Sequence, residues 1–150
     1  MIDSPIPGVP SIGIRVTQGR LVDIDFLFSR HSPFVEAAAA PIVRFLQDYL
    51  HHARDPAKPV EVAPGTPFQQ GVWRELIRIP FGETRSYGEL AKKLGSSARA
   101  VAGACRRNPL PLLVPCHRVV AKNGIGGFMG KTDGQALAIK RWLLQHEGHE

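Results

Sequence analysis

The sequence predicts an α+β fold in two parts: a small N-terminal α/β domain, made of a hairpin plus a helix, and a mostly helical C-terminal domain with a helix-turn-helix. Three observations carry this prediction. Apolar and polar residues alternate between residues 12 and 28, apolar residues recur at helical spacing in several later segments, and residues 54–65 contain three prolines, as linkers often do. We therefore expect a short N-terminal domain and linker over 1–64 and a second domain over 65–150.

The N-terminal part contains a predicted hairpin and a predicted helix. Ile12–Val16 and Leu21–Phe28 alternate on either side of the turn-like Thr17–Arg20, which indicates two paired strands. Pro41 suits the first position of a helix, and apolar residues at helical spacing extend that helix to about Ala53. Two histidines near its end, His51 and His52, have no third ligand at suitable spacing, so they predict a solvated or dipole-facing role.

The second domain is predicted to begin with a helix capped by Thr66, with Pro67 at its first position. Pro80 and Gly82 end it. Its apolar stripe is expected to be core and comprises Phe68, Val72, Trp73, Leu76, Ile77 and Ile79.

Two short helices joined by a tight turn follow. Ser86 caps the first, with Glu89 completing a capping-box pattern, and the helix runs to Leu94 before the Gly95-Ser96 turn. The second helix runs from about Ser97 to Arg107, and Asn108 can supply a left-handed C-cap. This layout predicts the helix-turn-helix.

The second of these helices is slim. Ala98, Ala102 and Gly103 are typical of it, and Arg99 is its only long side chain near the start. Such a helix offers few side chains that could hydrogen-bond to base edges. It can, however, approach a minor groove, which is about 6 Å wide, more closely than an ordinary helix. The alternative is that the small residues serve tight helix–helix packing.

The segment Cys116-His117-Arg118 places a thiol, an imidazole and a guanidinium next to one another. It lies between two apolar runs, 110–114 and 119–121, and we expect the first of these to be a strand. A thiol is nucleophilic as thiolate, which a neighbouring imidazole or cation favours. The segment therefore indicates a reactive cysteine, with a small buried cysteine as the alternative. A glycine-rich loop over 124–130 and a last helix from Gln135 to His146 follow, and the helix is expected to face inward with Leu137, Ile139, Trp142, Leu143 and Leu144.

Composition and charge narrow the class of protein. The 150 residues are 43% hydrophobic, enough for an ordinary core. Residues 1–64 carry a net charge of −1 and residues 65–150 a net charge of +7, which suits a polyanion such as nucleic acid. Two cysteines, Cys105 and Cys116, cannot form a disulfide framework or a four-cysteine zinc site. No apolar run predicts a membrane span, and no signal peptide is recognisable. We expect a cytoplasmic monomer with reduced thiols and no cofactor, metal or membrane contact.

Several motifs occur together in the second part. They are Ile79-Pro80-Phe81-Gly82, Ser86-Tyr87, Arg99-Ala100-Val101, Asn108-Pro109, Val114-Pro115-Cys116-His117-Arg118-Val119-Val120, and Lys140 with Trp142-Leu143-Leu144 and His146-Glu147-Gly148. In this order and spacing the chain resembles the O6-alkylguanine-DNA alkyltransferases. The resemblance covers essentially all of residues 66–149, whereas the first 64 residues are similar to that family only in layout.

The resemblance implies direct DNA repair. An alkyl group such as methyl would pass, in a single turnover, from O6-alkylguanine in duplex DNA to Cys116, after the base is flipped out from the minor groove. His117 would act on the thiol through a water molecule, Glu147 would orient His117, Asn108 would tie the helix-turn-helix to this segment, and Tyr87 would donate toward the leaving guanine. A thioether product cannot be hydrolysed as an acyl-enzyme is, so each molecule would act once.

The same resemblance implies two further sets of residues. DNA would be contacted by Arg99, which would fill the stack vacated by the flipped base, and by Ala98, Ala102, Gly103, Arg106 and Arg118. The base pocket would be formed by Val119, Gly127, Phe128, Met129 and Lys140.

Three alternatives accompany this interpretation. The first is a non-catalytic binder of alkylated DNA, although such proteins replace the acceptor cysteine that is present here as Cys116. The second is a helix-turn-helix regulator in which Cys116 is structural. The third is a Cys-His hydrolase, which would turn over repeatedly. Cys116→Ala separates the binders, which would be unaffected, from an alkyltransferase, which would lose transfer and keep DNA binding.

Overall fold

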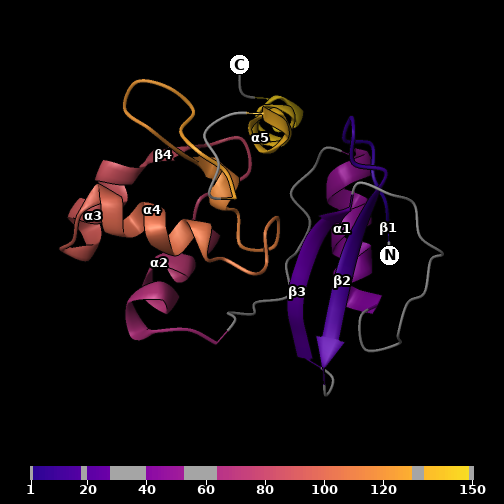
Figure 1. The fold of residues 1–150 in the computed structure, drawn as a ribbon, viewed down its shortest axis with the longest axis horizontal. Coiled ribbons are helices and arrows are strands. Elements are labelled where there is room, and N and C mark those ends of the chain that lie inside the picture. The colour runs from indigo at the N-terminus through magenta and orange to yellow at the C-terminus, as the bar shows by residue number, and fades with distance from the viewer. Residues whose placement is uncertain (1, 18–19, 28–39, 53–63, 130–133, 149–150) are drawn as a thin grey trace.

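The computed structural model describes residues 2–17, 20–27, 40–52, 64–129 and 134–148. Its N-terminal part contains an antiparallel sheet (Figure 1). The predicted hairpin is present as β2 (Ser11–Thr17) and β3 (Arg20–Leu27), with a register shift between Arg15 and Val16. A short strand that the sequence pattern did not indicate, β1 (Ile2–Asp3), pairs with β2, so the strand order is β1-β2-β3.

Helix α1 (Ala40–His52) confirms the predicted N-terminal helix. Its buried residues recur every three or four positions, which gives it one apolar face. They are Ile42, Phe45, Leu46, Tyr49 and Leu50. His51 is exposed, and its Nε2 lies 3.2 Å from the backbone oxygen of Asp3. This contact links the end of α1 to β1. The alternation and the helical spacing therefore both predicted real elements.

Helix α2 (Pro67–Ile77) begins at the predicted cap. The Thr66 hydroxyl accepts from Gln69 N at 3.1 Å, and the Gln69 side chain accepts from Thr66 N at 3.0 Å. Trp73 packs in the core and donates from Nε1 to the Ala104 carbonyl at 3.0 Å. One expectation was wrong: Phe68 is 38% exposed, because it lies in the first turn of the helix, away from the buried residues.

Helices α3 (Tyr87–Leu94) and α4 (Ala98–Arg106) are the predicted pair. Ser86 and Glu89 form the expected capping box, and Gly95 ends α3 with φ +64°. The prediction that Asn108 adopts a left-handed C-cap conformation is wrong. The C-cap of α4 is Arg107, with φ −92°, and Asn108 has no positive φ. The Asn108 side chain instead makes the hydrogen bonds described below.

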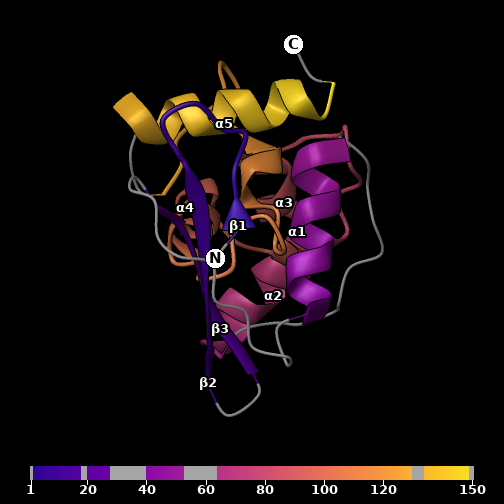
Figure 2. The same cartoon turned by 90° about the vertical axis from the view of Figure 1, so that its right-hand side faces the viewer.

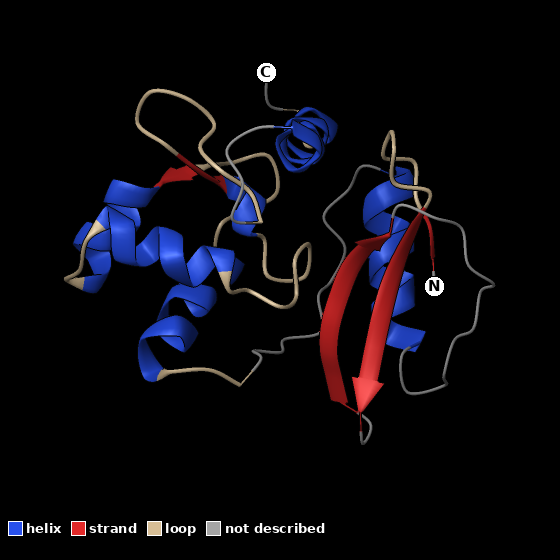
Figure 3. Ribbon diagram, viewed as in Figure 1, coloured by secondary structure: helices blue, strands red, loops and turns tan. Residues whose placement is uncertain are grey.

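The apolar run 110–114 is a series of turns and not the expected strand. Leu112 has φ +75° within it, and all five residues are buried. The 3₁₀ turn η2 (Cys116–Arg118) follows, and β5 (Val119–Val120) then pairs in parallel with β4 (Arg85–Ser86) (Figure 3). This pairing brings the start of α3 beside the segment that carries Cys116.

Helix α5 (Gly134–His146) runs across one end of the molecule, at the top of Figure 2, and in Figure 1 it lies above the junction of the sheet half and the α2–α4 half. The halves also touch directly: Ile24 N donates to the Pro109 carbonyl at 2.9 Å, and the Phe26 and Phe128 rings meet edge-on at 5.8 Å. The proposed linker falls largely on 53–63, outside the described residues, so the division at residue 64 stays a prediction. No described helix has the length and apolar character that crossing a membrane requires.

Candidate active site

Cys116 begins η2 and lines a pocket of about 390 Å³. The residue is 8% exposed. Burial raises the pKa of its thiol, while a hydrogen bond from the Asn108 side chain and the charge of Lys140 act in the opposite direction without outweighing it. The resting group is therefore a thiol, and a base has to remove its proton before it can attack.

Asn108 ties the end of α4 to the segment before Cys116. Its Nδ2 donates to the Val114 carbonyl at 2.8 Å, and its Oδ1 accepts from Leu110 N at 3.0 Å. Both partners belong to the buried turn that leads into η2, so one side chain sets the position of that turn relative to α4. This is the linking position that the sequence predicted for Asn108.

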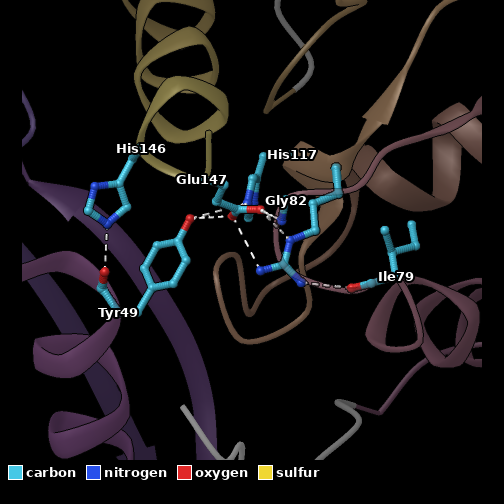
Figure 4. Close-up of polar contacts among 7 residues, drawn as sticks. Tyr49, Ile79, Gly82, His117, His146 and Glu147 are labelled. Atoms are coloured by element: carbon cyan, nitrogen blue, oxygen red, sulfur yellow. Dashed lines mark hydrogen bonds and ion pairs between the residues drawn. The ribbon is translucent and has the colours of Figure 1, made fainter. Parts of the chain in front are cut away.

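The imidazole next in sequence to Cys116 is that of His117, and its partner is Glu147. His117 Nε2 lies 2.5 Å from Glu147 Oε2, and both side chains are buried (Figure 4). A carboxylate can only accept, so Nε2 carries the hydrogen and Nδ1 keeps a lone pair. Among the described residues, Nδ1 is a buried nitrogen without a hydrogen-bond partner. Burial lowers the pKa of His117, so the ring is neutral and Nδ1 is free to take a proton.

Glu147 is held as a carboxylate. Burial pushes its pKa upward, but the hydrogen bond and charge of His117, together with Arg118, outweigh this and place the pKa below its ordinary value. Gly82 N adds a hydrogen bond to Oε1 at 3.1 Å. The negative charge is therefore available to stabilise an imidazolium at His117.

The prediction that Arg118 contacts DNA is wrong. Arg118 is 1% exposed, and its Nε donates to Glu147 Oε1 at 2.8 Å. Nη2 lies 3.3 Å from Glu147 Oε2, and Nη1 donates to the Ile79 carbonyl at 2.8 Å. A buried guanidinium needs a partner of opposite charge, and Glu147, 29 residues later in the chain, supplies it.

Tyr49 is a member of this cluster that sequence reasoning missed. Its hydroxyl donates to Glu147 Oε2 at 2.5 Å, from α1 in the N-terminal part (Figure 4). In the sequence it is one of several apolar or aromatic residues at helical spacing, which usually indicates core. The only signal was chemical, since a buried tyrosine hydroxyl needs a hydrogen-bond partner.

The pocket walls come from α3, α4 and the glycine-rich loop. Tyr87 donates its hydroxyl hydrogen to the Gly127 carbonyl at 3.5 Å, and burial raises the pKa of this tyrosine, so it stays a neutral donor. Phe128 is buried, whereas Met129 is 44% exposed with φ +54°. The lining residues are Tyr87, Arg99, Ala102, Gly103, Cys105, Arg106, Cys116, Gly127, Phe128 and Met129.

Two predicted pocket residues lie behind the wall. Buried Lys140 donates from Nζ to the carbonyls of Val119 at 2.6 Å and Gly127 at 2.9 Å. Burial lowers its pKa to about 8. Neither Lys140 nor Val119 is among the lining residues, so they support the pocket loop from behind.

Cys105 was missed as a lining residue, because it is an apolar-face position of α4. Burial raises the pKa of its thiol, and the nearby thiol of Cys116 adds to that effect. It lacks the adjacent imidazole that Cys116 has. Ala98, the remaining residue predicted to contact DNA, is exposed at the start of α4. Within the described ranges, no group of three or more His, Cys, Asp or Glu side chains is arranged to hold a metal ion.

Comparison with known proteins points to one family. Relatives include a methylated-DNA–protein-cysteine methyltransferase of Methanosarcina acetivorans, 50% identical over 92 residues (59% of this chain and 56% of the relative), and a constitutive one of Bacillus subtilis, 52% identical over 87 residues (55% and 50%). The chain spans about half the length of the curated relatives it matches.

A solved structure extends the similarity to nearly the whole chain. The crystal structure of Mycobacterium tuberculosis O6-methylguanine methyltransferase has a TM-score of 0.75 and 35% identity, over 97% of this chain and 89% of that one. A second structure of that protein, in complex with DNA, gives a TM-score of 0.75 and 36% identity over the same shares. Residues 67–149 match the family described as "6-O-methylguanine DNA methyltransferase, DNA binding domain", and the chain belongs to this family.

Proposed function

We propose that the protein repairs duplex DNA directly, by moving the alkyl group of O6-alkylguanine to Cys116 in a single turnover. The observation that carries the proposal is the placement of Cys116 in the pocket lining, next in sequence to His117, whose imidazole is hydrogen-bonded to Glu147. The names of the family and of its relatives support the same reaction.

The DNA-facing side of the site is formed by α4. Arg99 and Arg106 are exposed at the pocket, and Ala98, Ala102 and Gly103 keep the helix slim between them. We propose that α4 enters the minor groove, that the damaged base flips into the pocket, and that Arg99 fills the vacated stack. Flipping costs a few kcal/mol, which phosphate contacts from the basic segment help to offset.

The chemical step is a displacement at the alkyl carbon. The Cys116 thiol loses its proton through a water molecule to Nδ1 of His117, and Glu147 stabilises the imidazolium. The sulfur–carbon bond forms as the carbon–O6 bond breaks, and its electron pair stays on guanine. Tyr87 donates a hydrogen bond to that guanine, and the proton that His117 accepted passes through water to the guanine. The net result is a thioether and an unmodified guanine that carries the hydrogen lost by the thiol.

The pocket volume sets the size of the group that can react. A space of about 390 Å³ shared by the base and its substituent accommodates a purine with a small alkyl group. Met129 lies at its exposed rim and lengthens that wall.

We propose that the protein is a monomer and that it acts on DNA in the cytoplasm.

The DNA product gives the test. A duplex with one O6-methylguanine is incubated with limiting protein, and its nucleosides are quantified. The proposal expects loss of one lesion per protein molecule, with guanine appearing in its place. Cys116→Ser removes the reaction, while the matched Cys105→Ser retains it. Repeated turnover, or full activity of Cys116→Ser, contradicts the proposal.

A further inference from the structure

The carboxylate of Glu147 is completed by a side chain from outside the region that matches the family. Tyr49, in α1, donates its hydroxyl hydrogen to Glu147 Oε2 at 2.5 Å, across 98 positions of sequence. The same hydroxyl oxygen lies 3.4 Å from His117 Nε2. The family match begins at residue 67, so α1 is not part of it.

Both oxygens of this carboxylate have more than one donor. Oε1 accepts from Arg118 Nε at 2.8 Å and from Gly82 N at 3.1 Å. Oε2 is the oxygen that faces His117, and it also accepts from Tyr49. Arg118 Nη2 reaches the same oxygen at 3.3 Å. Tyr49 and His117 therefore share one oxygen atom, so the position of that atom depends on both.

The packing around Tyr49 holds its hydroxyl in place. The residue is 1% exposed. Its ring stacks on Phe45 at 6.4 Å between centroids and meets Phe81 edge-on at 5.9 Å. His146, the neighbour of Glu147, lies edge-on to the ring at 5.3 Å, and its Nε2 is 2.6 Å from the Tyr49 carbonyl oxygen (Figure 4). The ring cannot turn its hydroxyl away without disturbing contacts on all of these sides.

We infer that Tyr49 is a positioning residue of the His117–Glu147 dyad, so that α1 of the N-terminal part completes the proton-accepting machinery of Cys116. This inference rests on the proposed function. The Tyr49 hydrogen bond holds Oε2 in line with His117 Nε2. It also disperses charge on the carboxylate, which limits how strongly Glu147 attracts the His117 proton.

The charged and titratable groups around the dyad define the expected pH effect. Arg118 faces Glu147, the Lys140 charge and the Cys116 thiol lie near His117, and His146 contacts Tyr49. Tyr49→Phe leaves all of these in place and removes one donor from Glu147. The carboxylate then becomes more basic and stabilises the imidazolium, so His117 is protonated, and lost as a base, at a higher pH than in the wild type.

The test compares single-turnover transfer by the wild type and Tyr49→Phe, on a duplex carrying O6-methylguanine, as a function of pH. We expect the rate constant to fall roughly 10-fold or more, because misplacement of a catalytic group remote from the substrate has effects of this size. We also expect the acidic limb of the profile to move to higher pH. Rates are expressed per folded molecule, with the folded fraction taken from circular dichroism.

Phe45→Leu is the matched control. Phe45 packs on the same ring, and the structure records no contact between it and the carboxylate. Leucine keeps an apolar side chain against the Tyr49 ring, so this variant weakens α1 packing while the Tyr49 hydroxyl keeps its hydrogen bond to Glu147. It is expected to keep the wild-type rate per folded molecule and the wild-type acidic limb of the pH profile. If Tyr49→Phe is too unstable in buffer, all three proteins are measured in trimethylamine N-oxide, an osmolyte that favours the folded state.

The outcomes separate the two proposals. If the wild type transfers the methyl group, and Tyr49→Phe has the same rate constant and the same acidic limb of the pH profile, the positioning role is overturned and the proposed function stands. An equal loss in Tyr49→Phe and Phe45→Leu, without a shifted limb, shows a structural role only and also overturns it. A wild type without transfer overturns the proposed function itself.

Discussion

His117 and Glu147 form a fully buried pair in which one imidazole nitrogen, Nε2, lies 2.5 Å from one carboxylate oxygen. Lowered pKa values on both groups make this pair sensitive to acid. The pKa of His117 lies below its ordinary value of 6.5 because of burial, and the pKa of Glu147 lies below its ordinary value of 4.5 because the contacts of His117 and Arg118 outweigh burial.

The sign of the stability change follows from these directions. As pH falls from about 7 to about 4, the unfolded chain takes protons at both residues before the folded protein does, so the free energy of unfolding decreases. The slope reaches about 1.4 kcal/mol per pH unit for each proton that only the unfolded chain binds. Urea unfolding between about pH 7 and about pH 4 measures this decrease in the free energy of unfolding. The His117→Gln variant should show a smaller pH dependence in the upper part of that range. A wild-type stability that is flat down to about pH 4 contradicts the buried-pair description.

Lys140 should set the reactivity of the Cys116 thiol. Its charge lowers the pKa of Cys116 against the effect of burial, so Lys140→Met is expected to move the pH profile of Cys116 alkylation to higher pH. The profile is measured with iodoacetamide in a Cys105→Ser background. The variant also removes the Lys140 donor from the carbonyls of Val119 and Gly127, and Gly127 then keeps only the 3.5 Å hydrogen bond of Tyr87, so a loss of about 1–3 kcal/mol in stability is expected. Lys122→Met, at an exposed position, is the control. An unchanged profile in Lys140→Met rules out the electrostatic role.

Gly126 should be required for the position of Tyr87. A Cβ at Gly126 would lie 2.9 Å from Tyr87 Cε2 and 3.3 Å from its hydroxyl oxygen, and the residue has φ +75°. Gly126→Ala is therefore expected to displace Tyr87, to slow transfer, and to cost about 1–2 kcal/mol of stability from the left-handed backbone. Gly124→Ala is the control, since nothing lies within 4 Å of its Cβ position. Equal transfer rates in the two variants would show that Tyr87 does not need this space.

Arg99 should matter for duplex DNA more than for the chemical step. It is exposed where α4 meets the pocket, so Arg99→Ala is expected to slow transfer from duplex DNA at least roughly 10-fold, which corresponds to about 1.4 kcal/mol. Transfer from the free O6-methylguanine base, which needs no duplex contact, should be the same in Arg99→Ala and the wild type. Arg141→Ala, an exposed position outside the pocket lining, removes the same charge as a control. An equal loss in both variants would show a general charge effect, and loss with the free base would place Arg99 in the chemistry.

Local patterns predicted most of the fold. Capping residues such as Thr66 and Ser86 act on the backbone within three positions, so the sequence carries the whole signal, and the structure confirms both caps. The strand predicted over 110–114 was wrong, because continuous apolar residues are equally suited to a buried turn, and only tertiary packing decides between a turn and a strand. The left-handed C-cap expected of Asn108 was also wrong, whereas its side chain, for which the resemblance implied a linking role, hydrogen-bonds to Val114 and Leu110.

The site was predictable where its residues are neighbours in sequence or belong to a recognised motif. Cys116 and His117 adjoin, and the structure brings Glu147 to them. Arg118 was placed on the DNA surface because a cation in a basic segment is usually exposed, and its burial follows from a partner 29 residues away. Tyr49 could not be found in this way, because its hydroxyl meets Glu147 only after α1 and α5 have packed together.

The most direct test of the central claim is the intact mass of the protein after incubation with a duplex containing O6-methylguanine, followed by peptide mapping. The account predicts a gain of one methylene per molecule, carried by the peptide that contains Cys116, with no second addition at excess DNA. An unmodified duplex gives the baseline. An unchanged mass with selective binding of the damaged duplex would contradict the account and identify a lesion-binding protein, and modification at Cys105 would contradict the assignment of the nucleophile.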